Sequence, residues 1–142
     1  MKTSARNQFL GTVSAVRDGA INDEIVLATA GGQHIVANVT RESRHELKLE
    51  PGAKAFALVE ASSVAIVTQA ENVRMSARNQ LAGSVASISP GAGHCEVLIA
   101  LAGGASVAAI ISLHGMQALG LAPGDPATAV FKSSSVIVGV VV

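Results

Sequence analysis

A polar pentapeptide is written twice in this chain, and its residues could bind a small anion. SARNQ occupies residues 4–8 and again 76–80, and a serine pair recurs at 62–63 and 134–135. Lys132 stands two residues before the second serine pair, where Glu60 stands before the first. Arginine and lysine side chains only donate hydrogen bonds, and serine hydroxyls add further donors. A donor set of this kind predicts a site for a compact, tetrahedral oxyanion.

Two plainer explanations of the same residues stay open. A serine pair before a strand is often only a turn, and an arginine of SARNQ could pair with a carboxylate instead of a ligand.

Short helices are expected to begin after Thr40 and Ser112, which are good N-caps. Their first backbone N–H groups would add donors to an anion site.

Catalytic and metal-binding groups are scarce. The chain has four histidines, and none has another histidine 72 residues away, which is the spacing of the two SARNQ segments. They are His34, His45, His94 and His114. In the triplet His94–Glu96 neighbouring side chains of a strand would point to opposite faces. The glycine pairs at 31–32 and 103–104 are not followed by Lys-Ser or Lys-Thr, so they indicate hairpin turns and not a phosphate-binding loop. We therefore expect no enzyme, no cofactor and no directly coordinated metal.

Composition disfavours two classes of partner. Ten basic and ten acidic residues balance, and the chain has three Phe, no Trp and no Tyr. Without a positive field or aromatic stacking platforms, binding to nucleic acid or to an anionic membrane is not expected. The single cysteine, Cys95, fits a reducing compartment, and the first nine residues lack the apolar stretch of a signal peptide.

The repeat covers the whole chain. LATAGGQHIVANVT at 27–40 aligns with IALAGGASVAAIIS at 99–112, and LKLEPG at 47–52 aligns with LGLAPG at 119–124. We therefore predict two modules, 1–70 and 73–142. The uncharged stretch 97–117 is long enough to cross a bilayer, but its counterpart contains three charged residues, Arg41, Glu42 and Arg44. That stretch is expected to form two short elements around a turn.

Each module is predicted to be all-β with one short helix. Alternating or β-rich runs occur in the first copy at 11–19, on both sides of the glycine pair within 24–40, at 55–60 and at 62–68. Only 41–49 and 113–121 favour a helix, each followed by Pro-Gly. Five strands and a helix in about 70 residues are typical of a barrel like the oligonucleotide/oligosaccharide-binding (OB) fold. The second module has few charges, which favours an oligomer that covers part of its surface.

The combined motifs resemble the molbindin family. They are SARNQ at the module start, T-x-x-S before a helix ending in L-x-L-x-P-G, and a closing K-S-S-S-V-I. The resemblance covers both copies. It implies two tandem OB-like modules of the Mop type, a trimer of two-module chains, and a cytoplasmic protein that binds molybdate, and also tungstate, for storage or homeostasis. An alternative is a ligand-responsive regulatory or interaction module that binds a protein partner.

The resemblance also implies which residues bind the oxyanion, at sites between modules. The stronger class would use Ser76, Arg78, Lys132, Ser133 and Ser134, facing Thr40 and Ser43. The weaker class would use Ser4, Arg6, Glu60, Ala61 and Ser62, facing Ser112 and Gly115. Further sites on the oligomer axis would lie at the turns containing Gly19, Ala20, Gly91 and Ala92. The second set is expected to be weaker because Glu60 replaces a lysine and repels a dianion, and Gly115 lacks a hydroxyl.

Overall fold

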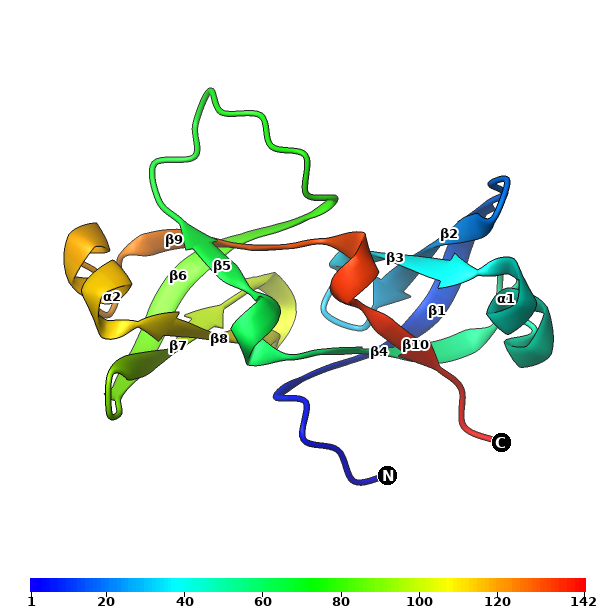
Figure 1. Ribbon diagram of the computed structural model, residues 1–142, viewed down its shortest axis with the longest axis horizontal. Helices are drawn as coiled ribbons and strands as arrows, with labels where there is room; N and C mark the ends of the chain where they lie inside the picture. Colours follow the sequence, from blue (N-terminus) through cyan, green and yellow to red (C-terminus); the bar gives the residue numbers. More distant parts are fainter.

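The computed structural model describes residues 1–142 as an elongated molecule built from two five-stranded antiparallel sheets (Figure 1). The two α-helices lie at opposite ends of the long axis, and β5 and β10 lie nearer its middle. No helix is both long enough and apolar enough to cross a membrane. The predicted all-β class is confirmed.

Both repeats fold into the same order of strands and α-helix, and the second adds a 3-10 turn, η2. The first contains β1 (Asn7–Arg17), β2 (Asn22–Thr29), β3 (His34–Thr40), α1 (Arg41–Leu47), β4 (Lys54–Val59), the 3-10 turn η1 (Ala61–Ser63) and β5 (Ala65–Val67). The second contains β6 (Asn79–Pro90), β7 (His94–Ala100), η2 (Ala102–Gly104), β8 (Ser106–Ser112), α2 (Leu113–Leu119), β9 (Pro126–Phe131), η3 (Ser133–Ser135) and β10 (Ile137–Gly139). Burial alternates along β2 and β7, as expected for strands with one face on a core.

The two repeats exchange their last strands. One sheet has the order β10-β4-β1-β2-β3 and the other the order β5-β9-β6-β7-β8. In Figure 1 the red β10 accordingly lies beside β4 of the first repeat. The boundaries 1–70 and 73–142 stay a prediction about the sequence repeat, and the sheet pairing runs across them. One apolar cluster of 24 buried residues, drawn from both repeats, joins the two sheets.

The helices begin where the sequence predicts and end two residues earlier. Thr40 and Ser112 are the N-caps, and their side chains accept hydrogen bonds from the backbone N–H of Ser43 and Gly115. The helices end at residues 47 and 119 and not at 49 and 121, because Lys48 and Gly120 take the left-handed conformation. The N–H groups of these two residues then close the last helical turn.

The predicted glycine-pair turns connect β2 to β3 and β7 to β8, and they meet at the junction of the repeats. Gly103 has φ of 76°, and a Cβ there would collide with the backbone carbonyl of Gly31. Glycine therefore permits both the local turn and the close approach of the two repeats.

Candidate functional site

The asparagine of each SARNQ segment joins one repeat to the other. The Asn79 side-chain amide donates to the Val36 carbonyl at 2.8 Å and accepts from the Val36 N–H at 2.8 Å. Asn7 makes the same pair of bonds to Ala108, at 2.8 and 2.7 Å. Both asparagines are buried, and β3 and β8 are sheet edges. The amides thus satisfy edge backbone groups that would otherwise be buried unpaired.

Sheet register brings Arg78 beside Lys132. Asn79 pairs with Phe131 across β6 and β9, so the residues just beyond this pair, Arg78 and Lys132, follow at the same end of the ladder. The η3 turn, which contains Ser133 and Ser134, packs against β3. Arg78, Lys132 and the η3 serines therefore lie at one end of the β6–β9 ladder, whereas Ser76 lies exposed in the segment before β6.

The same register brings Arg6 beside Glu60 in the other half of the molecule. Asn7 pairs with Val59 at the end of the β1–β4 ladder, and Arg6 and Glu60 are the next residues of the two segments beyond that pair. The η1 turn, which follows Glu60 and contains the buried Ala61 and the exposed Ser62, packs against β8. Ser4 is exposed two residues before Arg6.

Each SARNQ arginine is also paired with a glutamate of the other repeat. Arg78 Nη1 lies 3.0 Å from Glu24 Oε2, and Arg6 pairs with Glu96, the residue equivalent to Glu24. The hydrogen bond to Glu96, with its Coulomb attraction, raises the pKa of Arg6 above its ordinary value. The pairing with a carboxylate that the sequence left open is therefore present in both copies.

The two arginines differ in their electrostatic surroundings. Arg78 is paired with one carboxylate, Glu24, and a cation, Lys132, follows at the same end of the β6–β9 ladder. Arg6 is paired with Glu96, and a second carboxylate, Glu60, follows at the same end of the β1–β4 ladder. The first group carries net positive charge and the second net negative charge, so a dianion is attracted more strongly to the first.

The facing residues of the predicted sites lie at the helix starts. Thr40 Oγ1 accepts from the Ser43 N–H at 3.1 Å and donates to Ser43 Oγ at 2.9 Å, and Ser112 Oγ accepts from the Gly115 N–H at 3.0 Å. These helices lie at the ends of the molecule, away from β5 and β10 (Figure 1). No hydrogen bond or ion pair joins Thr40 or Ser43 to Arg78 within the chain.

The turn with Gly19 and Ala20 is held against the start of α1 by a charged cluster. The Gly19 N–H donates to Asp23 Oδ1 at 3.0 Å, and Arg41 donates to the Gly19 carbonyl. Arg44 binds Asp23 Oδ2 at 3.1 Å and also pairs with Asp18 and Glu50. This cluster was not predicted from the sequence, although its ion-pairing residues are all charged and none of them recurs in the second copy.

Asp23 is fully buried, and its charge is compensated from several sides. The hydrogen bond from Gly19 and the one from Arg44 lower the pKa of Asp23, against the opposing effect of burial. The hydrogen bond to Asp23 in turn raises the pKa of Arg44 above its ordinary value, while Arg44 Nε stays buried without a partner. The cluster thus holds the turn that contains Gly19 and Ala20 in place through the carboxylate of Asp23, which must stay ionised.

This cluster predicts an acid-dependent loss of stability. Because the folded pKa of Asp23 lies below its ordinary value of 3.8, its stabilising contribution is complete above that pH and is lost as pH falls through the folded value. Asp23→Asn should lower the midpoint of urea unfolding at neutral pH. The midpoint of this variant should also fall less than that of the unaltered chain as the pH is lowered from about 4 to about 2. Glu46→Gln, at an exposed helix position outside the cluster, is the control. Parallel pH curves for Asp23→Asn and the unaltered chain would contradict the role of Asp23.

The second repeat replaces this cluster as a unit. Its equivalent positions carry Pro90, Cys95, Leu113, Met116 and Ala122. Here the turn with Gly91 and Ala92 is closed by backbone bonds, from the N–H of Gly91 to the carbonyl of His94 at 2.7 Å and from the N–H of Leu113 to the carbonyl of Gly93 at 3.1 Å. Within the His94–Glu96 triplet, Cys95 is buried and His94 exposed, as the alternation of a strand predicts.

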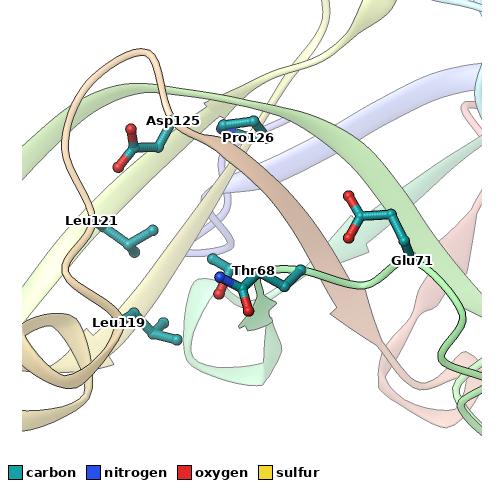
Figure 2. Close-up of a pocket in the computed structure, with 7 residues that line it drawn as sticks. Thr68, Glu71, Leu119, Leu121, Asp125 and Pro126 are labelled. Atoms are coloured by element: carbon teal, nitrogen blue, oxygen red, sulfur yellow. The ribbon is translucent and has the colours of Figure 1, made fainter.

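A separate cleft of about 240 Å³ lies between the linker, which joins β5 to β6, and the second repeat (Figure 2). Its lining residues are Thr68, Gln69, Glu71, Leu119, Leu121, Asp125 and Pro126. The cleft has two carboxylates and no basic side chain, and none of the predicted oxyanion residues line it. A dianion would be repelled there, so this cleft is not the candidate site.

Comparison with known proteins shows the family to which this chain belongs. A family model for the TOBE domain matches residues 3–66 and 75–138. A crystal structure of the cytoplasmic molybdate-binding protein ModG, in a form with molybdate bound, has a TM-score of 0.96 and 44% identity, covering 99% of this chain and 100% of that one.

Two curated relatives are longer proteins. Molybdenum transport protein ModE of Azotobacter vinelandii is 44% identical over 140 residues, which are 99% of this chain and 52% of that protein. Molybdenum-pterin-binding protein MopA of Rhodobacter capsulatus is 42% identical over 137 residues, or 96% and 52% of the two chains. The chain therefore spans about half the length of the curated relatives it matches.

Proposed function

Because this chain belongs to the TOBE domain family, with one copy in each repeat, we propose that it binds molybdate, and also tungstate, as a non-enzymatic intracellular store. The membership agrees with the resemblance to molbindin in the sequence, and ModG, which has the same fold over its whole length, is a cytoplasmic molybdate-binding protein. Storage requires only reversible binding, for which fixed donors and a small number of cations suffice.

The observation that carries the proposal is the grouping of Arg78, Lys132 and the η3 serines. Arg78 and Lys132 directly follow the Asn79–Phe131 pair at one end of the β6–β9 ladder, and η3, which begins after Lys132, would supply hydroxyls and backbone N–H groups. A guanidinium fork and an ammonium together match the charge of a tetrahedral dianion. Glu24 occupies only one nitrogen of Arg78, so other guanidinium donors stay available.

The site is proposed to be completed by another copy of the chain. Thr40 caps α1 and Ser43 lies in its first turn, at one end of the molecule, and neither residue makes a hydrogen bond to Arg78 within the chain. In a trimer these hydroxyls would face the Arg78 group of a neighbouring chain, and Ser112 and Gly115 would face the Arg6 group. The Gly19–Ala20 and Gly91–Ala92 turns are the proposed axis sites.

A second candidate function follows from the length of the relatives. Since this chain matches about half of ModE and MopA, the same fold could act as a ligand-responsive module that contacts a protein partner. Storage predicts several ions per oligomer without any partner. A regulatory module predicts a partner that associates only when molybdate is present.

Calorimetric titration with molybdate, tungstate and sulfate, together with the mass in solution, tests the proposed function. We expect a trimer that binds several molybdate or tungstate ions and ignores sulfate at equal concentration, since fixed donors discriminate by cavity size. The absence of molybdate heat at any concentration, with no bound molybdenum by elemental analysis, would refute the proposal and favour the partner-binding alternative.

The electrostatic difference between the two groups gives a specific prediction. Glu60→Lys should tighten the weaker class of site about tenfold, because it exchanges repulsion of a dianion for attraction next to Arg6. Glu71→Lys makes the same charge change in the linker, outside the Arg78 and Arg6 groups. It should leave the molybdate affinity of the weaker class of site unaltered. An equal effect of the two substitutions would show that net charge alone is responsible.

A further inference from the structure

Glu24 lies between two arginines of different exposure. Its Oε2 is 3.0 Å from Arg78 Nη1, and its Oε1 is 3.8 Å from Arg17 Nη1. The Arg17 side chain is 76% exposed and the Arg78 side chain 46% exposed, whereas that of Glu24 is only 20% exposed. One half-buried carboxylate on β2 therefore links a candidate oxyanion ligand to a more exposed surface cation.

We propose that Glu24 sets the affinity of the Arg78 class of site for the oxyanion. In the empty protein Glu24 forms an ion pair with Arg78, and when Arg78 binds the oxyanion Glu24 pairs with Arg17 instead. This inference rests on the proposed function. It makes binding an exchange of ion pairs, in which the oxyanion and Glu24 compete for the same guanidinium.

The exchange follows from charge. A dianion beside Arg78 is attracted by the guanidinium more strongly than a single carboxylate is, and it repels Glu24. A half-buried carboxylate without a cationic partner is unfavourable, which opposes the release of Arg78. Arg17 removes part of that penalty, since it already lies within ion-pair distance of the second oxygen.

The second repeat lacks the alternative partner. Glu96 pairs with Arg6, but the position equivalent to Arg17 is Ser89. Release of Arg6 would therefore leave Glu96 without a cation, and the side chain of Glu96 is only 30% exposed. The Arg6 class is weakened by this difference in addition to the effect of Glu60.

A double-mutant cycle tests the exchange by calorimetric titration with molybdate. Glu24→Gln should tighten the Arg78 class about fivefold, because the competing charge is gone while an acceptor oxygen remains. Arg17→Ser, which introduces the residue of the second repeat, should weaken the same class about threefold. In the Glu24→Gln background, Arg17→Ser should have no effect, since no carboxylate is left to accept.

Matched controls and outcomes separate this inference from the proposed function. Glu71→Gln and Lys54→Ser make the same charge changes at exposed positions without ion pairs, and both should leave the affinity unaltered. Unchanged or weaker binding by Glu24→Gln would overturn the exchange, and so would additive effects in the double variant. If the unaltered chain binds no molybdate, the proposed function itself fails.

Discussion

Arg78→Ala is expected to remove the stronger class of oxyanion site while the chain stays folded. Arg78 supplies the guanidinium of the proposed group with Lys132 and the η3 serines, since Arg78 and Lys132 directly follow the Asn79–Phe131 pair. Charge-assisted hydrogen bonds to a dianion are among the stronger polar contacts, so affinity in this class should fall about a hundredfold, or about 3 kcal/mol. The side chain is half exposed and leaves no cavity, so thermal stability should change little.

The measurement is the number of molybdate ions bound per chain, by calorimetry and by elemental analysis after gel filtration. Arg74→Ala serves as the control, since this exposed arginine four residues upstream makes no ion pair. Arg78→Ala should lose one class of ions and Arg74→Ala none. Unchanged stoichiometry and affinity in Arg78→Ala would remove Arg78 from the site and with it the assignment of that class.

The second large effect is expected on stability. Asn7→Ala should lower the free energy of unfolding by about 2–4 kcal/mol, because both the N–H and the carbonyl of Ala108 lose their side-chain partner in a buried setting. These bonds connect residues 101 positions apart, on different sheets. Loss of the contact should therefore also weaken the association of the two repeats.

Urea denaturation of Asn7→Ala and Gln8→Ala checks this prediction. Gln8 is the next residue of the same motif, but it is exposed and makes no side-chain hydrogen bond. The substitution at Gln8 should change stability by less than about 0.5 kcal/mol. Similar losses for the two variants would mean that the amide of Asn7 contributes nothing specific.

The expected effects of Arg78→Ala and Asn7→Ala assign different roles to the two faces of the SARNQ motif. One face is proposed to bind the oxyanion, and the other is structural. Along residues 4–8, Ala5 and Asn7 are buried while Ser4, Arg6 and Gln8 are exposed. The alternation of an extended chain separates the faces, so the donors proposed to bind the oxyanion are adjacent to the residue that joins the repeats.

Much of this architecture could be predicted from the sequence alone. The fixed spacing of SARNQ indicated the tandem repeat, and the family model later matched both copies. The glycine pairs predicted the hairpins, and Thr40 and Ser112 predicted the helix starts, because turn and cap chemistry acts within a few neighbouring residues.

Only the tertiary structure decided which strands pair and what the motif residues contact. β5 and β10 could have completed their own sheets, since backbone edges of the two repeats offer the same hydrogen bonds; their exchange depends on the packing of the whole molecule. Likewise the partner of Asn79 is 43 residues away and that of Arg78 is 54 residues away. The sequence determined the local elements and the candidate donors, while the long-range packing decided that Asn79 joins the repeats and that Arg78 meets Glu24.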